Sequence, residues 1–273
     1  MSPAEAGGRR SGARWILAVY GVTVLLFLCL PIVIVVPMSF SSASSLEFPP
    51  PGFSLRWYQA FFGDVRWLDA LRISAIVAVA SSTIALLLGS LAAYGLVRGS
   101  FRGRAIIEGS FIAPLIIPSV IIAVALYIFL AQVGLLGTLA GLILGHTILG
   151  VPYVVLVMSV AIRSFDVRIE QAAYTLGASS ATMFRLVLLP NLIPSVFAAW
   201  IFAFINSFDE VIITVFISGA YQTVPKRMFN ELVLEVNPTI TAIATLLIAF
   251  SVVTVALIAL LLKRGGLRMR SLV

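Results

Sequence analysis

The stretch that decides the fold reads Arg168-Ile-Glu-Gln-Ala-Ala-Tyr-Thr-Leu-Gly177-Ala-Ser-Ser-Ala-Thr-Met-Phe-Arg-Leu-Val-Leu-Leu-Pro190. It is polar and separates two apolar runs that are each long enough to cross a membrane. Because glycine has no Cβ and adopts the left-handed turn that stops a helix, we predict that a first short helix ends at Gly177. Ser179 or Ser180 then caps a second helix, which runs to about Leu189 before the proline. The stretch is therefore predicted to form a projecting helical hairpin that docks onto another protein.

The composition of the chain excludes a soluble protein. Of the 273 residues, 61% are hydrophobic and only 11% are charged, which leaves too little polar surface to cover a water-soluble domain. We therefore expect an all-α integral membrane protein in a lipid bilayer. The formal net charge of +7 comes mostly from arginines near predicted helix ends, so we ascribe it to membrane topology. Since no soluble basic face is present, nucleic acid is not an expected partner.

Six apolar runs have the length needed to cross a hydrocarbon core of ~30 Å. The first run is longer than the ~7–15 residues of a signal-peptide core, so we predict a retained first helix rather than a cleaved signal. Pro114 and Pro118 indicate a kink near the middle of the third run. The six predicted transmembrane helices cover residues 15–40, 68–97, 107–131, 136–162, 192–217 and 238–262.

The distribution of Lys and Arg predicts the orientation of these helices. Most of the positive charge lies at the two chain ends, in the loop after the second helix and in the loop after the fourth. Because loops rich in Lys and Arg stay in the cytoplasm, we expect both termini there. The predicted organisation is a cytoplasmic segment 1–14, a six-helix transmembrane domain 15–262 with a cytoplasmic loop 164–190, and a basic cytoplasmic tail 263–273.

Three further features have a structural explanation beside a functional one. Residues 54–62 carry aromatic side chains at helical spacing, and we predict a loop helix, with an interfacial helix as the alternative. Gly137, Gly141 and Gly145 recur every fourth residue, which predicts close helix packing. His146 is the single histidine, and a satisfied buried histidine is favoured over a pore-lining one.

The chain lacks the residues of an enzyme. It has no Gly-x-x-x-x-Gly-Lys-Ser/Thr stretch to hold nucleotide phosphates. No nucleophile–histidine–carboxylate set and no Cys/His metal cluster can be assembled. The one cysteine, Cys29, cannot form an internal disulfide and is expected to pack among apolar side chains. We expect a chain without catalytic, metal or cofactor sites, so any energy comes from a partner.

Two adjacent carboxylates interrupt the fifth predicted helix. Asp209 and Glu210 follow closely on Asn206 and Phe208. An ionised side chain inside a span costs ~2.5–3.5 kcal/mol on insertion scales, so such residues face a cavity or a partner. One reading is an anionic wall that attracts a cationic substrate. The other is a carboxylate pair bonded to nearby backbone or to the basic side chains that follow the helix.

The 168–190 stretch resembles the signature of membrane subunits of type I ABC importers, in which Glu-Ala-Ala, Gly and Ile-x-Leu-Pro stand at fixed spacing. It departs from that pattern at Gln171, where the pattern has glutamate. The resemblance implies the type I ABC importer transmembrane-domain fold and docking of the loop onto a separate cytoplasmic ATPase, which binds ATP and Mg. A plain helical hairpin is the alternative. The implied ATPase-coupling residues are Glu170, Gln171, Ala172, Ala173, Gly177, Val187, Leu189 and Pro190.

From about residue 66 onward the chain is similar to membrane subunits of spermidine/putrescine importers. The similarity is densest between Arg163 and Leu247 and includes the Val236-Asn237-Pro238 sequence before the last helix. It implies a polyamine-type cationic substrate, a periplasmic or extracellular substrate-binding protein, a second related permease subunit, an ATPase dimer and the bacterial inner membrane. The implied substrate-path residues are Asn206, Phe208, Asp209 and Glu210.

Other functions stay open from the residues alone. An importer of another small organic solute, such as an opine or an amino-acid derivative, would share an acidic pair. A secondary transporter driven by an ion gradient would need several charges inside its spans, but Asp69 and Glu108 fall at predicted helix ends. A membrane scaffold would use the loop only for assembly. The mechanism that the resemblance implies is alternating access, in which the ATPase dimer pushes on the 164–190 loop.

Overall fold

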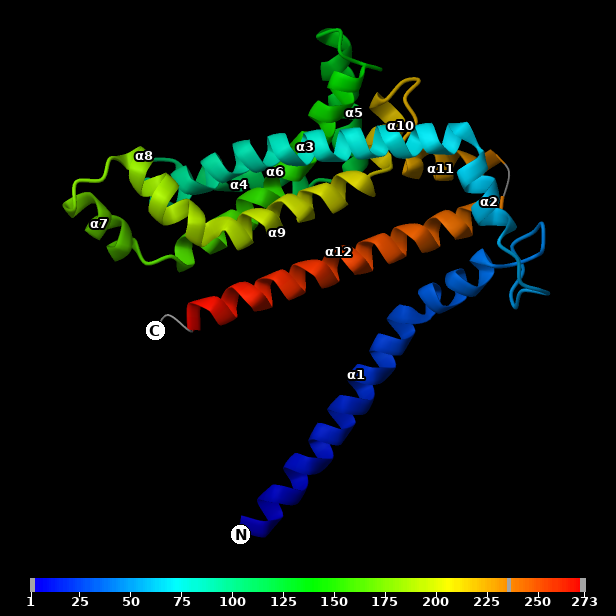
Figure 1. The fold of residues 1–273 in the computed structure, drawn as a ribbon, viewed down its shortest axis with the longest axis horizontal. Helices are drawn as coiled ribbons and strands as arrows, with labels where there is room; N and C mark the ends of the chain where they lie inside the picture. Colours follow the sequence, from blue (N-terminus) through cyan, green and yellow to red (C-terminus); the bar gives the residue numbers. More distant parts are fainter. Residues whose placement is uncertain (1–2, 235–236, 271–273) are drawn as a thin grey trace. The chain divides into compact units, whose positions relative to one another are not determined.

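The secondary structure is helical throughout the part of the chain that the computed structural model describes (Figure 1). The backbone is described for residues 3–234 and 237–270, and side chains for 15–233 and 237–256. Within these ranges the only strand-like feature is an isolated bridge between Ser41 and Phe53. The chain divides into two compact units, residues 1–64 with 234–250 and residues 65–233 with 251–273. The all-α prediction is confirmed.

Among the described residues, five helices are long and apolar enough to cross a membrane, and a bent helix pair adds a sixth span if it is counted as one. The membrane-length elements are α1 (Pro3–Ser39), α3 (Val65–Arg98), α6 (Leu139–Ser164), the run α8–η1–α9 (Ser180–Met183, Phe184–Leu188 and Leu189–Phe208) and α12 (Thr239–Arg270). The bent pair is α4 (Arg104–Ile116) and α5 (Ser119–Gln132). The shorter helices are α2 (Arg56–Gly63), α7 (Val167–Thr175), α10 (Ile212–Ile217) and α11 (Val224–Leu234).

In the first unit, polar and aromatic contacts fix the loop that joins α1 to α2. The hydroxyl of Tyr58 lies 2.8 Å from Oγ of Ser39, and its ring lies 5.2 Å from the ring of Phe40. Arg56 donates to the carbonyl of Ser42 at 2.8 Å. The predicted loop helix is thus present as α2. Cys29 is exposed on α1, so the expectation that it packs inside this chain is wrong.

In the second unit, α3, α6 and α9 lie side by side and enclose the main apolar core (Figure 1). Small residues allow this close approach, as the packing rules for membrane helices require. A Cβ on Gly150 of α6 would come within 3.1 Å of the Cβ of Ala85 and 3.5 Å of that of Ala203. The buried side chains of this core are Ala85, Ala93, Val154, Met158, Ala161, Ile162, Met183, Leu188, Leu192, Ala199 and Ala203.

The predicted glycine stripe is only partly helical. Gly145 lies in α6 and packs against Ile217 and Ile213 of α10, as predicted for a packing residue. Gly137 instead precedes α6, has a φ of 73°, and donates its N–H to the carbonyl of Ile217 at 3.1 Å. The helix begins later than predicted because the side chain of Thr138 caps it, accepting from the N–H of Gly141 at 3.0 Å.

The third predicted span is broken rather than kinked. Helices α4 and α5 meet at an angle of 106°. Ile117, which precedes Pro118, has a φ of −73° and a ψ of 132°. The proline ring disfavours helical geometry for the residue before it, so Ile117 is extended and the helix stops. The predicted kink near the middle of this span is therefore a full break between two helices.

The second helix of the 164–190 loop does not end before Pro190. It passes from α8 through a π-helical turn, Phe184–Leu188, directly into α9. Pro190 is the second residue of α9, directly after the π-helical turn. The side-chain amide of Asn191 donates to the carbonyl of Val187 at 2.7 Å. The predicted stop is wrong because the altered turn accommodates the proline.

Two predicted helix ends also move. The fifth predicted helix, 192–217, ends at Phe208, and a break separates α9 from α10. The last helix continues to Arg270, beyond the predicted end at 262. Residues 235–236 and 271–273 lie outside the described residues, and so do parts of the resemblance and of the basic tail that fall on them.

Candidate functional site

The 164–190 loop forms a capped helical hairpin. The side chain of Asp166 caps α7, accepting from the N–H of Arg168 at 2.9 Å. Gly177 has a φ of +85° and donates its N–H to the carbonyl of Tyr174 at 3.0 Å. Oγ of Ser179 then accepts from the N–H of Thr182 at 3.2 Å and begins α8. The predicted glycine turn and serine cap are both confirmed.

The residues implied in ATPase coupling divide between an outer and an inner face of this hairpin. Gln171, Ala172 and Pro190 are exposed. Ala173 and Val187 instead pack against the apolar core of the unit. The exposed face also carries Leu176, of which 88% of the surface is accessible. Sequence reasoning missed this leucine, although a leucine beside a helix-stopping glycine marks the tip of a hairpin.

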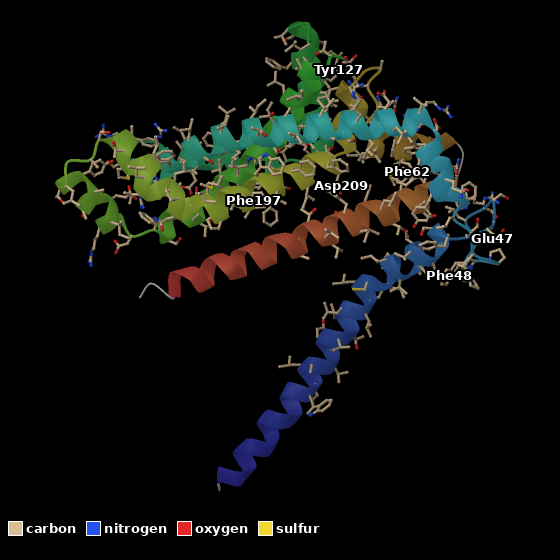
Figure 2. The ribbon with its side chains drawn as sticks, in the orientation of Figure 1. Glu47, Phe48, Phe62, Tyr127, Phe197 and Asp209 are labelled. Carbon is tan, nitrogen blue, oxygen red and sulfur yellow. The ribbon has the colours of Figure 1, made fainter. Side chains whose placement is uncertain are left out.

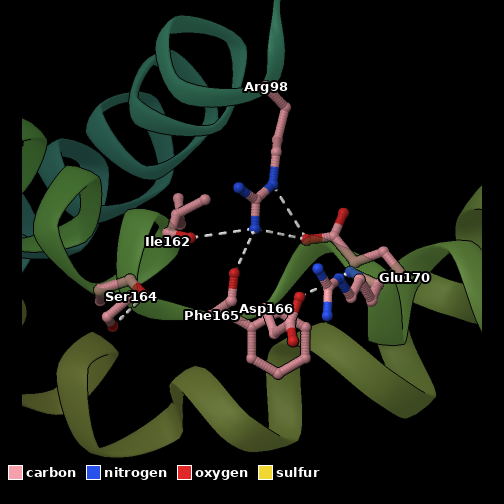
Figure 3. Close-up of polar contacts among 8 residues, drawn as sticks. Arg98, Ile162, Ser164, Phe165, Asp166 and Glu170 are labelled. Atoms are coloured by element: carbon pink, nitrogen blue, oxygen red, sulfur yellow. Dashed lines mark hydrogen bonds and ion pairs between the residues drawn. The ribbon is translucent and has the colours of Figure 1, made fainter.

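Glu170 points inward, toward the end of α3 (Figure 3). Its Oε1 lies 2.6 Å from Nη2 and 2.9 Å from Nε of Arg98. Nη2 of Arg98 also lies 3.0 Å from the carbonyl oxygens of Ile162 and Phe165. Sequence reasoning assigned Arg98 only to topology. Its contacts join the last residue of α3 to both α6 and α7.

The acidic pair, Asp209 and Glu210, lies at the break between α9 and α10. Figure 2 shows Asp209 at the end of α9. Asp209 continues the last turn of α9, with its N–H 3.0 Å from the carbonyl of Ile205. Asp209 is an exposed residue, and its carboxylate makes no hydrogen bond or ion pair with the described residues. Oε1 of Glu210 accepts from the N–H of Ile213 at 2.9 Å and caps α10. Bonding to nearby backbone therefore applies to Glu210 and not to Asp209.

The basic side chains beyond α10 are occupied elsewhere. Nζ of Lys226 donates to Oγ of Ser218 at 2.7 Å and to the carbonyl of Gly219 at 2.8 Å. Burial lowers the pKa of this ammonium below its ordinary value. Arg227 forms an ion pair with Glu231 at 3.3 Å. The predicted alternative, in which these cations neutralise the acidic pair, is not what the structure shows.

A buried polar network holds the helix break in place. Nδ1 of His146 lies 2.8 Å from Oγ of Ser207, and Nε2 lies 2.9 Å from Oγ1 of Thr214. Ser207 also accepts from the hydroxyl of Ser81 at 3.0 Å, and Thr214 donates to the carbonyl of Glu210 at 3.0 Å. The network joins α3, α6, α9 and α10. His146 is 1% exposed, so the prediction of a satisfied buried histidine is confirmed.

An aromatic column runs along α9 toward the acidic pair. Trp200, Phe204 and Phe208 stack with ring centroids 5.3 and 5.6 Å apart. Trp200 is fixed by a hydrogen bond of 3.1 Å from Nε1 to Oγ1 of Thr83. Of these rings the sequence prediction contained only Phe208, although spacing of four residues places all three on one helix face. Nδ2 of Asn206 is enclosed and has no hydrogen-bond partner among the described residues.

Within the described residues, no group of three or more His, Cys, Asp or Glu side chains could hold a metal ion. The two features that the sequence analysis predicted as sites, the hairpin of α7 and α8 and the acidic pair after α9, are both present as distinct structural elements.

Comparison with known proteins gives a consistent result. The family model described as "binding-protein-dependent transport system inner membrane component" matches residues 85–265. The spermidine/putrescine transport system permease protein PotC of Escherichia coli (strain K12) is 31% identical over 249 residues, covering 91% of this chain and 92% of PotC. The putrescine transport system permease protein PotI of the same strain is 35% identical over 247 residues, covering 88% and 86% of the two chains.

Solved structures agree on the fold. A chain from the crystal structure of a bacterial ABC transporter involved in import of the acidic polysaccharide alginate superposes with a TM-score of 0.67 at 16% identity. The match covers 97% of this chain and 98% of that chain. A chain of the inward-facing MetNI methionine ABC transporter gives a TM-score of 0.54 at 18% identity, covering 76% and 95%. At these identities the likeness concerns the fold alone.

Proposed function

This chain belongs to the family of binding-protein-dependent transport system inner membrane components, and we propose that it carries a polyamine-type cation, such as putrescine or spermidine. It is a multi-pass inner membrane permease of an ABC importer, a transport subunit rather than an enzyme. The polyamine permeases PotC and PotI, similar over most of their length, support the substrate class. Both termini are proposed to lie in the cytoplasm, in line with the distribution of Lys and Arg.

The observation that carries the substrate class is the carboxylate of Asp209. It lies at a break directly after a membrane-length helix, and no described cation neutralises it. An unpaired carboxylate at such a place is stabilised by a cation that it binds. The neighbouring ring of Phe208 belongs to the stacked column, and aromatic faces attract ammonium groups. Asp209, with Asn206, Phe208 and Glu210 around it, is therefore our candidate for part of the substrate path.

The energy of ATP hydrolysis is proposed to reach this chain through the hairpin of α7 and α8. Its exposed residues, including Gln171, Ala172 and Leu176, form the surface that we propose docks onto a cytoplasmic ATPase dimer, where ATP and Mg bind. Glycine at Gly177 sets the sharp turn on which the shape of this surface depends. We further propose a soluble substrate-binding protein and a second permease subunit, related to this chain or a second copy of it, that completes the pore.

The proposal is tested by transport in proteoliposomes. The chain is reconstituted with its ATPase and companion permease, and the soluble substrate-binding protein is added outside the vesicles. Uptake of labelled putrescine and spermidine is then measured with and without internal ATP. We expect ATP-dependent uptake that each polyamine competes. Uptake of a different organic cation, but of neither polyamine, would overturn the substrate class and keep the importer. Uptake that needs an ion gradient and no ATP would overturn both.

A further inference from the structure

The ends of α3, α6 and α7 meet at one guanidinium group. Arg98 is the last residue of α3. It contacts the carbonyl of Ile162 in the last turn of α6, the carbonyl of Phe165 just after α6, and the carboxylate of Glu170 in the first turn of α7 (Figure 3). One side chain thus contacts the end of α6, the loop after it and the first turn of α7. The three helix ends have no other shared ionic contact among the described residues.

The chemistry of this contact requires arginine. The last carbonyls of a helix have no partner within the helix, and their partial negative charge favours a nearby cation. The planar guanidinium presents Nε and Nη2 to Oε1 of Glu170 while Nη2 also reaches the two carbonyl oxygens. A lysine ammonium carries its three donors on one nitrogen at the end of a flexible stem, so it lacks the planar fork that presents Nε and Nη2 together.

Burial distinguishes this ion pair from a neighbouring one. The side chains of Arg98 and Glu170 are 19% and 5% exposed. The pair between Arg163 at the end of α6 and Glu108 of α4 is 52% and 31% exposed. Separating a buried pair leaves an uncompensated charge in a poorly solvated place, whereas an exposed pair contributes little. The contact between Arg98 and Glu170 therefore resists separation, and the contact between Arg163 and Glu108 does not.

We propose that Arg98 is a positioning residue that clamps α7 to the ends of α3 and α6, so that the three move as one body when the ATPase moves the hairpin. The inference rests on the proposed function, because it specifies how the docked hairpin passes motion to the spans. Glu170 then acts inside the chain, and its exposed neighbour Gln171 faces the partner. Without this contact, α7 moves with the ATPase, but α3 and α6 do not move with α7.

The first experiment measures this rigidity directly. Spin labels are placed at Thr175→Cys on α7 and Leu88→Cys on α3, two exposed positions, after Cys29→Ser removes the one native cysteine. We expect a single narrow distance distribution that is the same in the free chain and in the complex trapped with ATP. Glu170→Gln and Arg98→Lys should broaden it, and Arg163→Gln, which removes the exposed pair, should not.

The second measurement separates transmission from folding and docking. In the reconstituted complex the readout for Glu170→Gln and Arg98→Lys is the amount of substrate transported per ATP hydrolysed, which is independent of how much ATPase each variant binds. The amount of substrate transported per ATP should fall by about fivefold or more, because an ATP-driven shift now moves α7 without the spans. Arg163→Gln should keep the parent ratio. A merely structural role would lower hydrolysis, assembly and transport together and leave the ratio unchanged.

Each outcome bears on the clamp. A distance distribution in Glu170→Gln that is as narrow as that of the parent chain would overturn the proposed clamp. A parent distance distribution that shifts when the complex is trapped with ATP would also overturn it. Loss of ATPase binding in Arg98→Lys with an unchanged distance distribution would assign the pair to docking instead. Failure of the parent chain to bind any ATPase would reject the proposed function, yet the distances in the free chain would still decide whether the clamp exists.

Discussion

Nδ1 of His146 lies 2.8 Å from Oγ of Ser207, deep inside the second unit, and this contact ties the middle of α6 to the end of α9. On the other side of the ring, Nε2 reaches Thr214 of α10. A histidine with both nitrogens engaged spans the gap that the break after Phe208 leaves between two helices. The polar network therefore links α9 and α10 across the break through a side chain of α6.

Replacing this histidine should loosen the break. In His146→Phe the ring volume is largely kept, but the hydroxyls of Ser207 and Thr214 each lose a partner, which costs ~1–3 kcal/mol in a buried site. Thermal unfolding of the purified protein in detergent measures the loss. Thr147→Val is the matched control, since its buried hydroxyl bonds only to the carbonyl of Ile143 in its own helix. Equal thermal stability of His146→Phe and the parent would show that the polar network does not stabilise the fold.

Two glycines of α3 provide a test of helix packing. A Cβ on Gly89 would lie 2.7 Å from Cγ1 and 2.8 Å from Cβ of Val154, whereas nothing lies within 4 Å of one on Gly95. Gly89→Ala should therefore destabilise the protein by ~1–3 kcal/mol through overpacking. Gly95→Ala should be neutral or stabilise it by up to ~1 kcal/mol, because alanine favours the helix. The same unfolding assay compares them, and a larger loss in Gly95→Ala contradicts the packing.

Much of this architecture is readable from the sequence because apolar length and helix-stopping chemistry are local properties. The runs that form α3, α6 and α12 are long and apolar, and the turn at Gly177 with its cap at Ser179 follows from conformational freedom and hydrogen bonding within a few residues. The family signature at 168–190 likewise consists of residues close together in the sequence, so its position does not depend on tertiary packing.

Other features depend on contacts that no local pattern reveals. Prolines at 114 and 118 allow either a kink or the observed break of 106°, and tertiary packing decides between them. Pro190 predicts a helix stop, but a π-helical turn before it lets the helix continue into α9. The partner of Glu170 is Arg98, 72 positions away, and their pairing depends on how α3 and α7 meet. The role of Asp209 as a substrate contact stays a prediction.

The turn at Gly177 should be required for docking. Its φ of +85° is a conformation in which a side chain costs ~1–2 kcal/mol, although a Cβ there meets no atom within 4 Å. Gly177→Val should therefore reduce ATPase binding by about 5–30-fold, through strain in the turn alone. Gly177→Asn is the control, because asparagine tolerates the left-handed conformation. Pull-down titration with the purified ATPase measures the affinity of each variant. Similar affinities for the two variants would mean that ATPase binding does not depend on the geometry of this turn.

The two carboxylates after α9 should behave differently although they are adjacent. Asp209 is exposed and unpaired among the described side chains, whereas Glu210 caps α10 through the N–H of Ile213. Asp209→Asn removes the charge and should raise the KM for polyamine uptake about tenfold, equivalent to about 1.4 kcal/mol of binding free energy, with unchanged thermal stability. Glu210→Gln retains an oxygen that can accept from the same N–H, so its KM should rise by less than about threefold.

Initial uptake rates over a range of spermidine concentrations give the KM of both variants. If Glu210→Gln has the larger effect, the half-buried carboxylate and not the exposed one faces the substrate, and a normal KM in both variants would move the cation site to the companion subunit.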